Sequence, residues 1–195
     1  MAAVKRLKRR ETVAHLLEQR KDALVVTGLG APSYDVMAAG DHDNNFYLWG
    51  AMGAAAMVGL GLALSQRKRP VLVFTGDGEQ LMGMGGLATV AVTRPENLVL
   101  IVLNNEHYGE TGMQRSHAGR GVDLVAVAAA CGIANSRRIT SAMELDGLCV
   151  DMHKRVGAIY AEIMIEADEP TRVLPPRDGV FVKNRFRKSL GFATI

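Results

Sequence analysis

Short continuous runs of apolar residues recur along the chain and alternate with sets of apolar residues at helical spacing. A continuous run predicts a strand buried on both faces, whereas spacings of three and four predict a helix. The predicted strands cover residues 23–27, 46–49, 70–75, 98–103, 134–138 and 158–165. The predicted helices cover residues 11–21, 53–65, 82–93, 123–131 and 141–156. A further short helix is expected to begin at a cap formed by Ser33.

This alternation favours one fold class. Strands separated by helices of about ten to fifteen residues predict right-handed crossovers. The expected fold is therefore α/β, an open and mostly parallel sheet flanked by helices. Asp123 is the expected cap of one helix, and Ser141 with Glu144 has the spacing of a capping box. No internal repeat or domain boundary is visible, so residues 1–195 are predicted to form a single domain whose segment 167–195 wraps the surface as a tail.

Composition adds a large core and a mild basic excess. Apolar residues make up 48% of the 195 residues and aromatic residues only 5%, which suits closely packed helices on a buried sheet. The net charge is +3. Much of the excess lies at the start of the chain, in Lys5, Arg6, Lys8, Arg9 and Arg10. Because these charges interleave with apolar positions and no aromatic residue accompanies them, a solvated helix start is favoured over an arm that binds nucleic acid.

The sequence also predicts the cellular compartment of the protein and the redox state of its cysteines. No stretch of about 18 residues is uniformly apolar, so no membrane span is expected. The basic start lacks the apolar core of a secretory signal, and a cytoplasmic protein is therefore expected. Cys131 and Cys149 lie in helix-like segments and are expected to be reduced thiols, with a disulfide between them as the alternative.

Three of the predicted strands end in loops of unusual composition. Residues 28–33 are GLGAPS, residues 76–79 are GDGE, and residues 104–109 are NNEHYG. In open parallel sheets, ligands bind beyond the carboxyl ends of the strands. About 25 residues separate GDG from the Asn-Asn pair, enough for one helix and one buried strand. That crossover would bring Asp77 and the asparagines to the same edge of the sheet.

The residues at this edge suit a magnesium ion that is shared with phosphate. Mg²⁺ takes about six oxygen ligands, several of them from phosphate groups and water. Asp77 offers a carboxylate, Asn105 an amide oxygen, and the segment at His107 a main-chain carbonyl. Gly76 and Gly78 let the backbone approach an anion, and the following helix directs its positive end there. Neither a GxxxxGK[ST] loop nor a GxGxxG motif after the first strand offers another phosphate site.

Each of these signals has a simpler interpretation when taken alone. A Gly-Asp-Gly tripeptide is usually a turn, and so is an Asn-Asn pair after a strand. Their conjunction, on two strands that are one crossover apart, favours the metal site. A Mg²⁺-dependent nucleotide-binding domain remains an alternative at this point.

The spacing of GDG and Asn-Asn resembles the signature of thiamine diphosphate-dependent enzymes, in their diphosphate-binding domain. Residues 44–55, NNFYLWGAMGAA, are similar to the NFYxxGxMGxA stretch of that domain, and residues 59–64 continue it. Residues 108–114, YGETGMQ, are similar to the loop after Asn-Asn in sulfopyruvate and phosphonopyruvate decarboxylases, and residues 183–186 resemble their tails. The resemblance covers residues 23–190, and the chain length is similar to that of a separate sulfopyruvate decarboxylase β subunit.

The resemblance implies a set of cofactor-binding residues. Mg²⁺ would be held by Asp77, Asn105 and the carbonyl of His107. Thiamine diphosphate would contact Gly28, Ala31, Ser33, Gly50, Met52, Gly76, Asp77, Gly78, Glu79, Asn105, Tyr108 and Gly109. Met52 would press beneath the bridge between the two rings and enforce the bent cofactor shape, although a core methionine is the simpler interpretation. Glu79 departs from the small or hydroxyl residue common after GDG, and would point away from the diphosphate or meet a basic residue of a partner.

The resemblance also implies that the chain is catalytically incomplete. In the family, a glutamate of a separate pyrimidine-binding domain contacts the cofactor ring and helps to remove the C2 proton. Such a domain needs more than about a hundred residues, for which this chain has no room. The expected protein is therefore the cofactor-binding subunit of a hetero-oligomeric lyase, and a partner subunit would carry the pyrimidine-binding domain.

The implied reaction is decarboxylation of a small anionic 2-oxo acid, of the sulfopyruvate or phosphonopyruvate type. The thiazolium ring takes up the electron pair left by carbon dioxide. Arg115, His117 and Arg120 can grip the anionic head of such a substrate, with a solvated loop as the alternative. His107 or His117 can also donate a proton, although a single loop histidine usually has no such role.

Two other functions remain open for the same cofactor. The intermediate left after decarboxylation can attack a second carbonyl compound, which gives acyl transfer or carboligation, as in acetolactate synthase-like enzymes. The chain can also be a non-catalytic module that binds thiamine diphosphate and regulates or scaffolds a partner.

Overall fold

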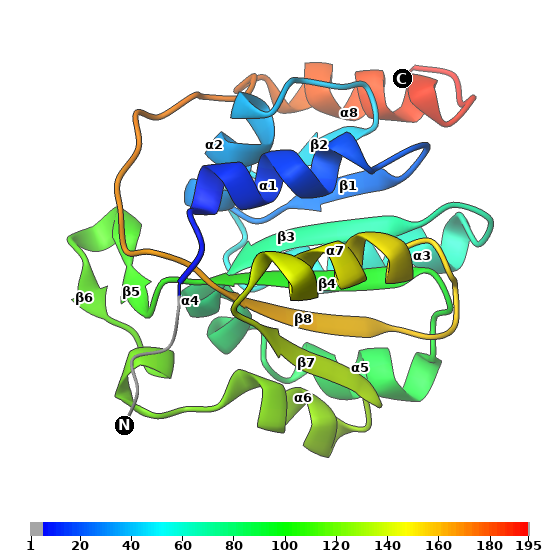
Figure 1. Ribbon diagram of the computed structural model, residues 1–195. Helices are drawn as coiled ribbons and strands as arrows, with labels where there is room; N and C mark the ends of the chain where they lie inside the picture. Colours follow the sequence, from blue (N-terminus) through cyan, green and yellow to red (C-terminus); the bar gives the residue numbers. More distant parts are fainter. Residues whose placement is uncertain (1–5, 195) are drawn as a thin grey trace.

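A six-stranded parallel sheet forms the centre of the computed structural model, which describes residues 6–194 (Figure 1). The strands are β1 (Leu24–Thr27), β2 (Asn45–Tyr47), β3 (Val71–Gly76), β4 (Leu98–Asn104), β7 (Asn135–Ile139) and β8 (Ile159–Met164). Their order across the sheet is β2-β1-β3-β4-β8-β7, and every neighbouring pair is parallel. The predicted α/β fold class is confirmed, and the GDG and Asn-Asn strands β3 and β4 are direct neighbours.

Helices cover both faces of this sheet (Figure 1). They are α1 (Arg9–Glu18), α2 (Ala31–Ala38), α3 (Ala55–Ser65), α4 (Asp77–Met82), α5 (Gly86–Thr93), α6 (Leu124–Cys131), α7 (Ala142–Asp151) and α8 (Gly179–Ser189). Helices α1, α2 and α7 pack against one face, and α3, α5, α6 and α8 pack against the other. Successive strand residues alternate between the two cores, as Val25 and Val26 do, because side chains of a strand point to opposite faces. Both faces are therefore buried, which explains the continuous apolar runs.

Two helix starts form as the sequence predicts, and a third does not. The Asp123 side chain accepts a hydrogen bond from the Ala126 N–H at 3.0 Å, and Ser141 and Glu144 form a capping box. Ser33 is not a cap, because α2 begins earlier with Gly30 as its N-cap residue. The Ser33 hydroxyl lies inside the first turn and donates to the Gly30 carbonyl at 2.8 Å.

The helix predicted at residues 82–93 begins later, as α5 at Gly86, and a separate helix that was not predicted, α4, precedes it from Asp77 to Met82. Between them the chain approaches the loop before α3 very closely. A Cβ atom at Gly83 would lie 2.1 Å from the Gly53 carbonyl oxygen, so only glycine fits there. Continuous apolar spacing cannot reveal a break that is imposed by a distant segment.

The segment after Glu166 is more than a tail, because it contains α8. Val182 and Phe186 are buried, and the Phe186 ring packs against Phe46 of β2 with 5.4 Å between centroids. Asp178 caps the helix by accepting hydrogen bonds from Val180 and Phe181. Because basic residues flank these two positions in the sequence, the helical apolar spacing is not visible there. The apolar pattern therefore predicts no helix at residues 179–189, where the structure has α8.

The basic start of the chain is not simply solvated. Arg9 is 6% exposed and its guanidinium lies 2.5 Å from the buried carboxylate of Asp35. Arg6 forms an ion pair with Glu106 at 2.6 Å. Lys5 lies outside the described residues. The interpretation as a solvated helix start is wrong for Arg9, which is buried and pairs α1 with Asp35 of α2.

Neither cysteine forms a disulfide in the described structure. Cys149 is buried and Cys131 is half-buried, and both are free thiols. Within residues 6–194, none of the helices is both long enough and apolar enough to span a bilayer.

Candidate functional site

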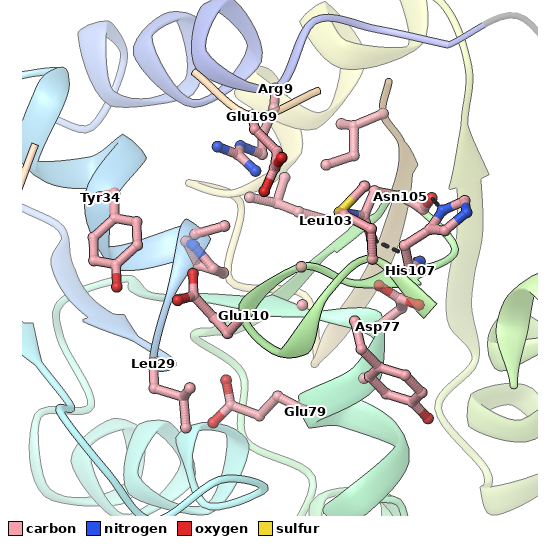
Figure 2. A pocket seen from close by; sticks show the side chains of 18 of the residues that line it. Arg9, Leu29, Tyr34, Asp77, Glu79, Leu103, Asn105, His107, Glu110 and Glu169 are labelled. Carbon is pink, nitrogen blue, oxygen red and sulfur yellow. Dashed lines mark hydrogen bonds between the residues drawn. The ribbon is translucent and has the colours of Figure 1, made fainter. Parts of the chain in front are cut away.

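A cavity of about 190 Å³ lies at the carboxyl ends of β1, β3 and β4. Segments from all three strand ends line it, together with the start of α1 and the segment after β8. Figure 2 shows Asp77, Asn105 and His107 together at one side of the cavity, with Tyr34 at the other. The parallel sheet explains this convergence, because parallel neighbours place their carboxyl ends, and the loops that follow, at one edge.

Asp77 is the first residue of α4 and is 2% exposed. Its carboxylate accepts a hydrogen bond from the Ser116 hydroxyl at 2.5 Å. Burial raises the pKa of Asp77 to about 6, although hydrogen bonds from Ser116 and from the Asp77 and Gly78 main chain oppose the rise. No ion pair with a basic side chain holds Asp77 in the described part of the chain. A buried carboxylate without a cationic partner is suited to receive a metal cation.

The two asparagines after β4 have different surroundings. Asn105 lines the cavity, and its amide oxygen accepts a hydrogen bond from the His107 N–H at 2.9 Å. Asn104 does not line the cavity; it donates to the buried carboxylate of Glu162 at 2.7 Å and accepts from the Glu106 N–H at 2.8 Å. Asn104 thus shapes the turn from beneath, and Asn105 presents its amide toward the same space as Asp77.

A short hairpin of β5 (His107–Tyr108) and β6 (Gln114–Arg115) forms one side of the site. The Tyr108 hydroxyl lies 2.6 Å from Nδ1 of His117. The Tyr108 ring also lies against Gly78, where an added Cβ atom would approach a ring carbon to 2.6 Å. Gly78 therefore leaves space for the ring as well as for a ligand. The hairpin holds Tyr108 over the start of α4.

Glu79 points away from Asp77, toward the loop that follows β1 (Figure 2). It is 5% exposed, and its carboxylate accepts hydrogen bonds from the Thr75 hydroxyl at 2.9 Å and from the Gly53 N–H at 3.4 Å. Burial raises its pKa, and these hydrogen bonds oppose the rise. A Cβ atom at Gly28 would lie only 1.5 Å from the Glu79 carboxylate, so glycine at position 28 makes room for this side chain.

Several other predicted site residues lie outside the cavity lining. The lining contains Ala31, Met52, Gly76, Asp77, Gly78, Glu79, Asn105, His107, Tyr108 and Gly109 of the predicted set. It does not contain Gly28, Ser33, Gly50, Arg115, His117 or Arg120. Gly28 and His117 contact lining residues, whereas Arg115 and Arg120 are exposed. The roles of these residues toward a ligand stay predictions.

The cavity also contains charged residues that no sequence motif indicates. Arg172 lies 3.3 Å from the carboxylate of Glu110, and its guanidinium stacks 5.6 Å from the centre of the Tyr34 ring. Arg9 and Glu169 line the same end. These residues come from α1, α2, the β5–β6 hairpin and the segment after β8. No local pattern could find them, because only the folded chain brings these segments together.

The comparison with protein families now decides the identity. Residues 30–163 match the family described as "Thiamine pyrophosphate enzyme, C-terminal TPP binding domain". The chain belongs to this family. The residues matched run from the start of α2 to near the end of β8, and they include the GDG and Asn-Asn loops.

Curated relatives support the assignment. Sulfopyruvate decarboxylase subunit beta of Methanothermobacter thermautotrophicus is 40% identical over 189 residues, covering 96% of this chain and 98% of that protein. Sulfopyruvate decarboxylase of Methanosarcina acetivorans is 41% identical over 133 residues, covering 68% of this chain and 34% of that protein. Phosphonopyruvate decarboxylase of Streptomyces viridochromogenes is 47% identical over 133 residues, covering 68% of this chain and 32% of that protein. The chain thus spans about a third of the latter two proteins and nearly all of the first.

Solved structures show the same fold. Benzoylformate decarboxylase from Polynucleobacter necessarius superposes with a TM-score of 0.67 at 23% identity, over 83% of this chain and 34% of that chain. A 4-hydroxybenzoylformate decarboxylase from Rhodococcus jostii RHA1 superposes with a TM-score of 0.68 at 18% identity, over 87% of this chain and 34% of that chain.

The residues present fit Mg²⁺ and the diphosphate of thiamine pyrophosphate. Asp77 is buried without a cationic partner, and Asn105, which lines the same cavity, offers a hard oxygen donor. Among the described residues, no group of three His, Cys, Asp or Glu side chains forms a self-sufficient metal cage. A metal held by so few protein ligands needs oxygen atoms from a bound anion, as Mg²⁺–diphosphate provides.

Proposed function

We propose that this chain is the cofactor-binding subunit of a 2-oxo acid decarboxylase of the sulfopyruvate or phosphonopyruvate type. The observation that carries the proposal is the convergence of Asp77 and Asn105 on one cavity. Both residues lie within residues 30–163, which match the thiamine pyrophosphate enzyme family. A relative that it matches over 98% of its length is named a subunit of sulfopyruvate decarboxylase.

The Asp77 carboxylate, the Asn105 amide oxygen and the His107 carbonyl would hold Mg²⁺. Main-chain N–H groups at Gly76 and Gly78 would meet the diphosphate, because neither residue has a side chain that blocks its approach. Tyr108 and Gly109 would cover the anion and exclude water. When bound, thiamine pyrophosphate supplies a thiazolium ring that stores the electron pair released with carbon dioxide.

Met52 would support the bent shape of the cofactor. It lines the cavity, and its methyl group lies 3.8 Å from the position of a Cβ atom at Gly78. An apolar side chain at this place offers dispersion contacts to a ring without competing for its polar atoms. Gly50, two residues earlier, is exposed and would leave space for the aminopyrimidine.

A partner chain with the pyrimidine-binding domain would complete the site. Several methionines near the start of α3 and the end of α4 are exposed, and one of them, Met52, lines the cavity; they are Met52, Met57, Met82 and Met84. Positions of added Cβ atoms at Gly53 and Gly86 lie 3.1 Å from Met82 and 2.9 Å from Met57, so these side chains form one neighbourhood. Exposed apolar groups of this kind favour contact with another protein.

The anionic head of the substrate would lie near the β5–β6 hairpin, where Arg115, His117 and Arg120 are exposed. Guanidinium groups bind sulfonate and phosphonate with paired hydrogen bonds. His107 and His117 are the candidate proton donors of this region, because His107 lines the cavity and His117 contacts Tyr108.

Co-purification from the native cell, followed by assays with a panel of 2-oxo acids, tests the proposal. The chain alone should bind thiamine pyrophosphate only in the presence of Mg²⁺ and should release no carbon dioxide. Together with its partner it should decarboxylate sulfopyruvate or phosphonopyruvate. A complex that binds the cofactor and turns over no 2-oxo acid would contradict the proposal and favour a non-catalytic binding module.

A further inference from the structure

The Glu79 side chain joins the end of β3 to the loop of residues 48–54, here termed the Met52 loop. One carboxylate oxygen accepts from the Thr75 hydroxyl at 2.9 Å, and the other accepts from the Gly53 N–H at 3.4 Å. The contact with Thr75 is buried, since Thr75 is 1% exposed and Glu79 is 5% exposed, and the contact with half-buried Gly53 is part-buried. A buried carboxylate whose two oxygens accept hydrogen bonds from two separate segments links those segments.

The Met52 loop needs such a contact because its backbone is strained. Ala51 has a φ of 56°, a left-handed conformation that side chains disfavour, and Gly53 has a φ of 92°. Backbone of this kind persists only where surrounding contacts determine it. The Gly53 carbonyl lies close to Gly83, where an added Cβ atom would approach it to 2.1 Å. Gly53 therefore donates its N–H to Glu79 and packs its carbonyl against the turn after α4.

The loop carries the side chain that enters the cavity. Met52 lies between Ala51, whose backbone is strained, and Gly53, and it lines the cavity next to Gly78. A shift of Gly53 would therefore shift Met52 relative to the start of α4. Gly28 shows that this arrangement is specific, because any side chain at position 28 would occupy the place of the Glu79 carboxylate.

We propose that Glu79 is a positioning residue that holds the Met52 loop, and with it Met52, against the wall of the cofactor cavity. It acts from beneath the loop and contributes no ligand to the metal. This inference concerns the chain without any ligand, and it does not depend on the proposed decarboxylase activity. It explains why a long acidic side chain is accommodated directly after Gly-Asp-Gly.

Backbone hydrogen exchange at Gly53 and acrylamide quenching of Trp49 test this role. Trp49 is the single tryptophan of the chain, lies in the Met52 loop and is 36% exposed. In Glu79→Ala, exchange of the Gly53 amide should become about tenfold faster and quenching of Trp49 about twofold stronger, because the loop loses its buried acceptor. Glu79→Gln should restore both within about twofold, since glutamine keeps an acceptor for Gly53 and its amide can donate to Thr75.

A matched control separates loop order from global stability. Ser141→Ala removes the cap of α7 on the opposite face of the sheet, and should lower stability while leaving both loop signals unchanged. If Glu79→Ala does not fold, Thr75→Val removes one of the two contacts and should give a smaller loosening of the same amide. Unchanged Gly53 exchange in the alanine or valine variant, or no rescue by glutamine, would overturn the proposal.

Equilibrium binding of thiamine pyrophosphate with Mg²⁺ gives the second readout. Glu79→Ala should weaken binding about tenfold because the loop must be ordered on binding, and Glu79→Gln should bind within about twofold of the original chain. Failure of the unmodified chain to bind the cofactor would contradict the proposed function alone. The Gly53 and Trp49 signals would still decide whether Glu79 holds the loop.

Discussion

The Ser116 hydroxyl donates to the Asp77 carboxylate at 2.5 Å and links the hairpin after β4 to the first residue of α4. This contact satisfies part of a buried carboxylate without neutralising its charge. A basic residue in the same place would stabilise the empty chain and would compete with a metal cation. The hydroxyl orients Asp77 and leaves its charge available for Mg²⁺.

Removal of the Asp77 carboxylate should abolish cofactor binding. In Asp77→Ala we expect affinity for thiamine pyrophosphate and Mg²⁺ to fall at least about 100-fold, because a buried anionic ligand of the metal is lost. Isothermal titration calorimetry with the chain alone measures this change. Undiminished affinity would show that the metal site lies elsewhere.

The same carboxylate should destabilise the metal-free chain at neutral pH. The pKa of Asp77 is raised by burial from 3.8 to about 6, so the folded state binds the proton more tightly than the unfolded state does. Its contribution to stability is present below about pH 4 and is lost as the pH rises through about 6. Asp77→Asn should therefore raise the free energy of unfolding at pH 7 by about 2 kcal/mol. Urea unfolding in chelator, at several pH values, measures the difference, which should vanish in acid; a destabilised variant at neutral pH would contradict the expectation.

The two asparagines after β4 form a matched pair. Asn105→Ala should weaken Mg²⁺-dependent cofactor binding about tenfold or more, because Asn105 lines the cavity, and should cost only about 1 kcal/mol of stability through the lost acceptor of the His107 N–H. Asn104→Ala should cost about 1–3 kcal/mol of stability, since it leaves the buried carboxylate of Glu162 with one donor fewer. Calorimetric binding and urea unfolding of both variants separate the two roles. Equal effects of the two substitutions on binding would contradict this division.

Gly78 and Tyr108 should be energetically coupled. Gly78→Ala places a Cβ atom 2.6 Å from a carbon of the Tyr108 ring, so the ring must move. We expect a loss of about 1–3 kcal/mol in the free energy of unfolding, and partial recovery when Tyr108→Ala is added. A double-mutant cycle by urea unfolding measures the coupling; strictly additive effects would show that the ring does not limit this position.

Helix α8 should be attached to the domain through Phe186. Phe186→Ala should lower the free energy of unfolding by about 3 kcal/mol, because Phe186 is buried against Phe46 of β2. Phe181 on the same helix is 49% exposed and provides the control, for which a change within about 0.5 kcal/mol is expected. Chemical unfolding of both variants makes the comparison. Equal losses would show that α8 does not pack as described.

The local sequence predicted most of the fold because the sheet is buried on both faces. The continuous apolar run at residues 98–103 predicts a buried strand, and the structure extends it by one residue to Asn104. The caps at Asp123 and Ser141 were also predictable, because a cap depends on neighbours only three residues away. Helix α8 was missed because its two buried residues stand among charged ones, and only β2 shows which face they cover.

The chemistry at the strand ends follows from local residue type and spacing. Residue type and spacing predict a magnesium site shared with phosphate at Gly76, Asp77, Gly78 and Asn105, since a parallel crossover places two such loops at one edge. Membership of the thiamine pyrophosphate enzyme family confirms the resemblance that this spacing indicates. The individual ligands of the metal stay predictions.

The surroundings of that motif depend on how the whole chain folds. Ser116 reaches Asp77, Glu79 reaches Gly53 and Arg9 reaches Asp35 across long stretches of chain. None of these pairs has a spacing that a helix or a strand would impose. Local patterns encode contacts within one element or one crossover, whereas these contacts depend on how separate elements pack, and packing is a property of the whole folded chain.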